Sequence, residues 1–138
     1  MTTFATQQTE TQSAPNNSIY QLVSNQLLQQ RTIILWGVVD DDSIRPLVEQ
    51  LFFLNGQDQG QPIRFIINSP GGMVTAGSAL LDVMASIQAP VHTYCMGNAA
   101  SMAAILFSAG TPGHRYVYPH AEIMIHQPSM GSFNGRLW

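Results

Sequence analysis

The stretch IRFIINSPGGMVTAGSALLDVMASI, residues 63–87, joins an expected strand to an expected helix through a glycine turn. Residues 63–67 form a short apolar run, which is typical of a buried strand. After the paired glycines Gly71 and Gly72, apolar residues recur every three or four positions, which is the period of a helix that ends before Pro90. The stretch therefore predicts one βα unit. Its expected helix face consists of Ala76, Leu80, Val83, Met84 and Ile87.

The same alternation extends in both directions along the chain. Asp40 to Ser43 supply capping side chains and negative charge for a helix start, and Pro119 separates two short apolar segments. Strands that alternate with helices predict an α/β fold with a mainly parallel sheet. The further strands are expected at 32–36, 91–96, 115–118 and 122–126, and the further helices at 44–54 and 102–109, with a small-residue turn at 97–100.

Composition limits the domain count and the chemistry. The 138 residues, 45% of them apolar, predict one domain over 18–138 after a flexible polar tail at 1–17. Five arginines against eight acidic residues provide no basic field for a nucleic acid partner. The sequence contains no lysine, which excludes Schiff-base chemistry, a Ser-Lys dyad and a complete phosphate-binding P-loop.

Cysteine and histidine usage argues against a metal site. The single cysteine, Cys95, can form neither an intrachain disulfide nor a cysteine-based zinc site, and it favours a reducing compartment. The four histidines are dispersed, so we expect no metal and no cofactor in this chain.

Residues 1–17 lack the features of a secretory signal, and no window approaches the roughly 18 apolar residues of a membrane span. The sequence predicts a cytoplasmic protein, or one in a reducing organelle, with no membrane partner.

The first candidate functional segment is the turn Asn68-Ser69-Pro70-Gly71-Gly72. Paired glycines let backbone N–H groups approach a ligand or a developing negative charge. The alternative is that they only form a tight strand-to-helix turn. Gly72, Gly77 and Ser78 match the outline of a P-loop, but the lysine position is missing, so nucleotide binding is not expected.

The second candidate is Ser101, which begins the apolar helix after the small residues Gly97, Ala99 and Ala100. A hydroxyl at this point lies at the positive end of the helix dipole, beside the free first-turn N–H of Met102. These are properties of a nucleophile, although a serine before a helix is more commonly a cap. The surrounding sequence is not the Gly-x-Ser-x-Gly elbow of the α/β-hydrolases.

Among the histidines, His126 is the best candidate for a general base. It ends an apolar run and precedes Gln127-Pro128, so its ring is expected to emerge at a strand end, where α/β sites collect. His92 lies in a strand expected to be buried, whereas His114 and His120 lie in turn-rich sequence and are expected at the surface.

Three blocks of sequence stand out together, at residues 67–72, 99–102 and 124–128. Their order and spacing resemble those of the proteolytic subunit of the Clp protease, and the likeness extends over 18–128. The resemblance implies a crotonase-like spiral of ββα units and a serine endopeptidase. In that enzyme Ser101 would be the nucleophile and His126 the general base. The N–H groups of Gly72 and Met102 would bind the oxyanion of the tetrahedral intermediate.

The resemblance also implies an assembly. Family members stack two seven-membered rings into a closed chamber, which a hexameric unfolding ATPase supplies with unfolded polypeptides. That partner, not this chain, would use the ATP. The N-terminal segment of each subunit would line the entry pore.

The sequence departs from the family pattern beyond His126. The family's third catalytic residue is an aspartate well beyond the histidine, whereas here the last aspartate is Asp82 and the only later carboxylate is Glu122. An imidazole without an orienting carboxylate loses on the order of 10⁴ in turnover. We therefore expect a domain incomplete at its C-terminal end, by truncation, frameshift or partial sequence, with weak or no activity. The segment 131–138 also differs from the family's continuation.

Two other functions fit parts of this pattern. The absent aspartate favours a non-catalytic structural or regulatory ring subunit. A third interpretation, that the chain is an acyl-CoA enzyme of the crotonase superfamily, rests only on fold analogy and the glycine turn. The adenine nucleotide of CoA usually requires basic side chains, of which this chain has few.

Overall fold

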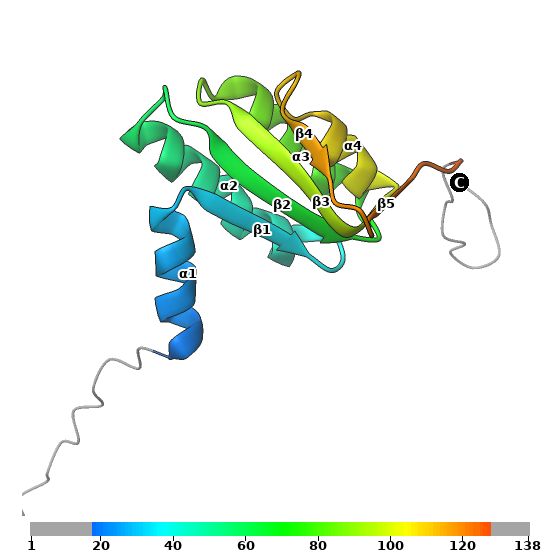
Figure 1. Cartoon of the computed structure of the whole chain (residues 1–138), viewed down its shortest axis with the longest axis horizontal. Coiled ribbons are helices and arrows are strands. Elements are labelled where there is room, and N and C mark those ends of the chain that lie inside the picture. Colours follow the sequence, from blue (N-terminus) through cyan, green and yellow to red (C-terminus); the bar gives the residue numbers. More distant parts are fainter. Residues whose placement is uncertain (1–17, 128–138) are drawn as a thin grey trace, which may run out of the picture.

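The computed structural model describes residues 18–127 as one α/β unit (Figure 1). The expected tail at 1–17, Pro128 of the third block and the segment 131–138 lie outside the described residues. The elements are α1 (Ile19–Gln29), β1 (Thr32–Trp36), α2 (Asp41–Gln57), β2 (Ile63–Ser69), α3 (Val74–Ser86), β3 (Val91–Ala100), α4 (Met102–Ser108), β4 (Arg115–Val117) and β5 (Glu122–Met124).

The sheet is parallel at every strand pair. Its order is β1-β2-β3-β4, and β5 also pairs with β3. Strand β4 lies beside Thr93–Cys95 and β5 beside Asn98–Ala100, so the two short strands follow one another along a single edge of β3. The prediction of an α/β fold with a mainly parallel sheet is confirmed.

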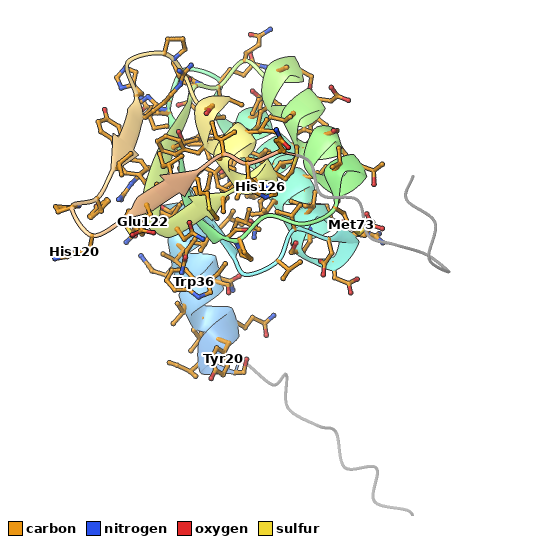
Figure 2. The ribbon with its side chains drawn as sticks, turned by 90° about the vertical axis from the view of Figure 1, so that its right-hand side faces the viewer. Tyr20, Trp36, Met73, His120, Glu122 and His126 are labelled. Carbon is orange, nitrogen blue, oxygen red and sulfur yellow. The ribbon has the colours of Figure 1, made fainter. Side chains whose placement is uncertain are left out.

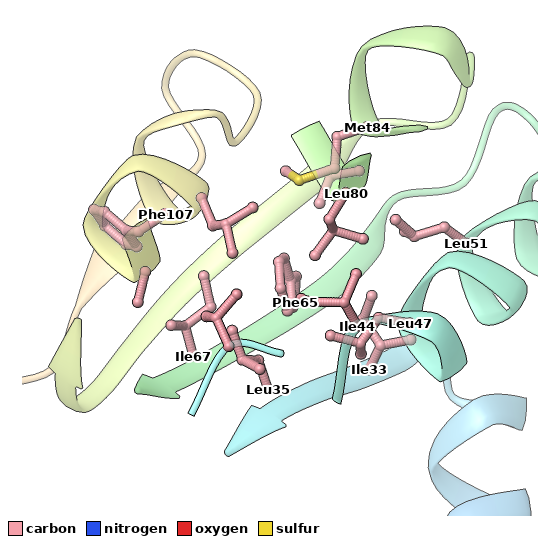
Figure 3. Close-up of a cluster of buried hydrophobic side chains, with 14 of the residues drawn as sticks. Ile33, Leu35, Ile44, Leu47, Leu51, Phe65, Ile67, Leu80, Met84 and Phe107 are labelled. Carbon is pink, nitrogen blue, oxygen red and sulfur yellow. The ribbon is translucent and has the colours of Figure 1, made fainter. Parts of the chain in front are cut away.

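One face of the sheet carries the core. Along β2, Ile63, Phe65 and Ile67 are buried while Arg64 between them is exposed, which is the period of two expected of a strand. Helices α2, α3 and α4 cover the buried face (Figure 1), and Figure 3 shows Phe65 between the strands and these helices. No helix within 18–127 is long and apolar enough to cross a membrane.

Four predictions of strand ends were wrong. Strand β2 continues to Ser69 instead of ending at Ile67, and β4 ends at Val117 instead of Tyr118. Strand β3 continues through the expected turn at 97–100, because the Asn68 side chain accepts a hydrogen bond from the Asn98 N–H at 3.1 Å and Gly97 adopts φ +78°. The pairing shifts there from Ile67–Cys95 to Ser69–Ala99, so β3 accommodates extra residues as a bulge. The last strand ends at Met124, so His126 lies beyond the strand rather than at its final position.

Phe65 provides a test of this core. Phe65→Leu removes part of a fully buried ring and is expected to lower the free energy of unfolding by about 1–2 kcal/mol. Phe52→Leu on α2 is the matched control, because that ring is 52% exposed and its loss should change stability by less than about 0.5 kcal/mol. Denaturant unfolding of both variants measures the difference. Equal effects would contradict the assignment of the core to this face.

Candidate active site

Three chain segments leave the sheet at the same edge. Because β2, β3 and β5 run parallel, their carboxyl ends lie together, and Gly72, Ser101 and His126 each follow one of them. A pocket of about 450 Å³ opens there. Its walls are formed by Pro70, Gly72, Val74, Ser101, Met102, Ile105, Ile125 and His126. The structure therefore brings all four predicted site residues to one pocket, while their catalytic roles remain predictions.

Ser101 occupies a strained strand-to-helix turn. Its backbone has φ 54° and ψ −122°, a region that non-glycine residues adopt at a cost of about 1–3 kcal/mol. The turn is fixed by its neighbours: the Ser101 N–H donates to the Met124 carbonyl at 2.9 Å, and the Ala104 N–H donates to the Ser101 carbonyl at 3.0 Å. This places the serine on a sharp turn like that of a nucleophile elbow, although the glycine signature of that elbow is missing.

The Ser101 hydroxyl does not act as a helix cap. Ser101 occupies the N-cap position of α4, but its side chain makes no capping hydrogen bond. A serine that only capped the helix would accept a hydrogen bond from an N–H of the first turn. The capping interpretation, left open by the sequence, does not account for the side chain.

Gly71 is required by close approach between two turns. With φ +90°, it lies so near the Ser101 turn that a Cβ atom would be 2.7 Å from the Ala100 carbonyl oxygen and 2.9 Å from Ser101 Cβ. The buried Ser69 hydroxyl accepts the Gly71 N–H at 3.1 Å and holds the turn. The glycine pair thus makes the tight turn and also lets it contact the serine.

Two backbone N–H groups at the pocket have no acceptor within residues 18–127. Met73 donates its N–H to the Val39 carbonyl at 2.7 Å, and Val39 donates to the Gly71 carbonyl at 2.9 Å. Between these bonds, the N–H of Gly72 donates to no residue within 18–127, and the same holds for the first-turn N–H of Met102. Two such donors at one pocket can bind an oxyanion.

His126 is oriented by a backbone carbonyl. Its Nδ1 lies 2.5 Å from the carbonyl oxygen of Gln127. A carbonyl only accepts, so Nδ1 carries a proton, and in the neutral ring Nε2 then presents its lone pair. No hydrogen bond links His126 to Ser101 among the described residues, although both line the pocket.

Glu122 does not support the imidazole. Figure 2 shows it at the start of β5, with His126 beyond the end of that strand. Within the described chain Glu122 forms no ion pair, and its backbone carbonyl contacts the Cys95 thiol at 3.6 Å. Thus no carboxylate within the described part of the chain orients His126.

The other histidines lie elsewhere. His92 is half-buried and stacks on His114 with 4.0 Å between ring centroids, and His120 is exposed, far from His126 in Figure 2. In residues 18–127 no three histidine, cysteine or acidic side chains gather as a metal site would require. Burial raises the pKa of the Cys95 thiol, which keeps it protonated.

The sequence analysis missed the apolar walls of the pocket. Val74 on α3 is 67% exposed, Ile105 on α4 is 49% exposed, and Ile125 is 79% exposed. Ile105 follows Ser101 by one helical turn, a spacing that could have identified it. Apolar side chains exposed around a polar centre are typical of a binding pocket.

A family model described as Clp protease matches residues 15–136 of this chain. The match covers all three sequence blocks, the whole described structure and every residue named at the pocket. The mainly parallel sheet with its alternating helices agrees with the crotonase-like fold of that family.

Proposed function

This chain belongs to the Clp protease family, and on that premise we propose that it is a serine endopeptidase subunit that cleaves unfolded polypeptides through an acyl-enzyme. In this proposal Ser101 is the nucleophile and His126 the general base. The N–H groups of Gly72 and Met102 form the oxyanion hole.

The proposed reaction has two halves. His126 Nε2 takes the proton from the Ser101 hydroxyl as Oγ attacks the substrate carbonyl, and the two N–H groups stabilise the oxyanion that forms. The imidazolium then gives its proton to the leaving amine as the C–N bond breaks. In the second half, His126 takes a proton from water as the water oxygen attacks the acyl carbon. The bond between that carbon and Ser101 Oγ then breaks, the imidazolium returns its proton to Oγ, and the carboxylic acid product leaves.

The observation that carries this proposal is the hydroxyl of Ser101 on a strained turn, where it makes no capping hydrogen bond. It shares one pocket with two N–H groups that have no acceptor among the described residues. Strained backbone at a pocket is characteristic of catalytic sites. The imidazole in the same pocket has its Nε2 lone pair available, because Nδ1 donates to the Gln127 carbonyl. Each part that peptide attack requires therefore has a candidate.

The walls of the pocket suggest the kind of substrate. Val74, Ile105 and Ile125 would surround an apolar substrate side chain beside the scissile bond.

We further propose the assembly that family membership implies, with stacked seven-membered rings and a hexameric ATPase partner that supplies the polypeptide and uses the ATP. We also propose a cytoplasmic location, since the lone cysteine Cys95 is a free thiol.

A non-catalytic ring subunit is the second candidate. It is favoured by one observation, namely that no carboxylate of residues 18–127 contacts His126. Such a subunit would join a ring of active relatives, and Ser101→Ala would leave the activity of that complex unchanged.

Hydrolysis by the purified full chain tests the proposal. With a labelled unfolded protein and an activated ester as substrates, His126→Gln is expected to lower turnover about 100-fold. No carboxylate of residues 18–127 supports the imidazole, so its contribution is already reduced. His120→Gln is the matched control, since that ring is exposed and distant, and it should leave turnover unchanged. Equal turnover in the unsubstituted chain, His126→Gln and His120→Gln would reject His126 as the general base.

A further inference from the structure

Strand β3 takes in extra residues at a bulge close to the pocket. Ile67 pairs with Cys95 and Ser69 pairs with Ala99, so the same stretch of sheet takes two steps along β2 and four along β3. Gly97 lies inside this bulge with φ +78°. Bulges beside active sites commonly redirect the side chains that follow them. The bulge is therefore a feature that can determine where the chain places Ser101.

The bulge decides which residue of the chain lies level with the glycine turn. Two residues beyond the last pair of β2 and β3, Gly71 lies against Ser101, and a Cβ atom on the glycine would be 2.9 Å from Ser101 Cβ. Without the bulge, Gly71 would lie level with Ala99 instead. Ser101 would then be about 7 Å farther along the strand direction. Because a displacement of about 1 Å can cost about 10²-fold in rate, the bulge is needed to bring the Ser101 hydroxyl to the oxyanion donors.

The side chain of Asn68 holds the bulge from the neighbouring strand. Its amide oxygen accepts the Asn98 N–H at 3.1 Å, at the point where the register of β3 against β2 shifts. A Cβ atom on Gly97 would lie 2.8 Å from that oxygen, so the glycine lets the amide approach the main chain of β3. The main chain of Asn68 is itself fixed on its other side, because its carbonyl accepts the Gly37 N–H at 2.9 Å. The amide thus joins the bulge to a strand that is held in place.

Backbone pairing connects the bulge to Ser101. Residues Asn98–Ala100 pair one after another with β5, and the next N–H, that of Ser101, donates to the Met124 carbonyl at 2.9 Å. The Ser101 backbone has the strained φ of 54°, and strained backbone persists only where the surrounding contacts determine it. A small movement at Asn98 is therefore expected to move the Ser101 hydroxyl relative to the Gly72 N–H.

From this geometry, and on the premise of the proposed function that Ser101 is the nucleophile, we propose that Asn68 is a positioning residue of the site. Its side-chain oxygen holds the bulge of β3 and thereby sets the place of the Ser101 hydroxyl. Asn68 is not among the residues that line the pocket, so it acts through the main chain of β3 and touches no reacting group. What matters at this position is an acceptor oxygen, which alanine lacks and aspartate keeps.

The rate of acylation by an activated ester tests this role in the full chain. Asn68→Ala is expected to lower the acylation rate constant about tenfold, while the ester concentration that gives half the maximal rate changes less than about twofold. The rate is taken per acylated chain, so a smaller folded fraction does not count as lost rate. Asn68→Asp should recover most of the rate, because its carboxylate accepts the Asn98 N–H. Equal losses in the two variants would overturn the role of the acceptor oxygen.

Asn55→Ala is the matched control. The Asn55 side-chain oxygen accepts the N–H groups of Gln88 and Ala89 at 3.1 and 3.0 Å, so it makes the same kind of bond just before β3 begins, at the opposite end of that strand from Ser101. Asn55→Ala should lose stability and keep its acylation rate. An equal fall in rate in Asn55→Ala and Asn68→Ala would show a general loss of packing and overturn the proposal.

Amide hydrogen exchange separates the positioning role from the proposed function. The Ser101 N–H is expected to exchange several-fold faster in Asn68→Ala than in the unsubstituted chain or in Asn55→Ala, whether or not the hydroxyl reacts. That pattern on an unreactive Ser101 would reject the peptidase proposal and support the positioning of the turn. Unchanged exchange in Asn68→Ala would overturn the positioning role. If Asn68→Ala does not fold, Asn68→Gln takes its place with the same expected results, because it moves the amide oxygen one carbon farther from the main chain.

Discussion

Ser101→Ala is expected to abolish acyl-enzyme formation and to lower turnover about 100-fold relative to the unsubstituted chain. In a full triad, loss of the serine costs roughly 10⁶ in turnover, and loss of the carboxylate alone costs roughly 10⁴. These losses do not add, because the residues act as one unit. No carboxylate of residues 18–127 contacts His126, so the loss due to the carboxylate is already present. Removal of the Ser101 hydroxyl is therefore expected to lower turnover by a further factor of about 10².

The fold should survive this substitution. The Ser101 side chain makes no capping hydrogen bond, and alanine and serine carry the same backbone strain at φ 54°. The control is Ser108→Ala on the same helix, where the hydroxyl donates to the Ala104 carbonyl at 2.8 Å, away from the pocket. Burst kinetics with an activated ester measure both variants. A burst of unchanged size in Ser101→Ala would show that another group carries the acyl chemistry.

Gly72→Ala is expected to unfold or strongly destabilise the domain, by about 4 kcal/mol or more. A Cβ atom at this position would lie 2.2 Å from the Val39 carbonyl oxygen and 2.9 Å from the Val39 nitrogen, and both are backbone atoms that cannot move separately. Relief of the overlap would break the bonds of Val39 with Gly71 and Met73. The loss is a large part of the 5–15 kcal/mol typical of a whole domain.

Gly113→Ala is the matched control for Gly72→Ala. Gly113 also has a positive φ, of +83°, but nothing lies within 4 Å of its added Cβ atom. Its substitution should cost about 1–2 kcal/mol, from the backbone conformation alone. Thermal and denaturant unfolding of both variants give the comparison. If both lost the same stability, the close packing of the Gly72 turn on Val39 would be contradicted.

The sequence predicted most of the fold because its apolar periodicity is strong. The strand at 32–36 was predicted with the observed bounds, and the Asp40–Ser43 capping box at the start of α2 is present in the structure. Helix α1 was not assigned, although Ser18 caps it and Leu22 and Val23 follow Ile19 by three and four residues, which is helical spacing. No residue of α1 is buried, and periodicity is a weaker guide where no core fixes the pattern.

The convergence of the site could also be expected from the sequence, because the carboxyl ends of parallel strands meet at one edge. Details that depend on side-chain contacts could not. The bulge at Gly97 needs the Asn68 side chain from another strand, and the tautomer of His126 depends on where the Gln127 carbonyl points. Neither contact leaves a periodic signal in the chain.

Covalent labelling with a fluorophosphonate, followed by mass mapping of the adduct in the full chain, tests the central claim most directly. The phosphonate reacts with an activated serine hydroxyl and its phosphoryl oxygen occupies the oxyanion hole. The account predicts a single adduct on Ser101, formed more slowly in His126→Gln. An adduct on a different residue, or no adduct on a chain shown to be folded, would contradict the assignment of this pocket as a serine peptidase site.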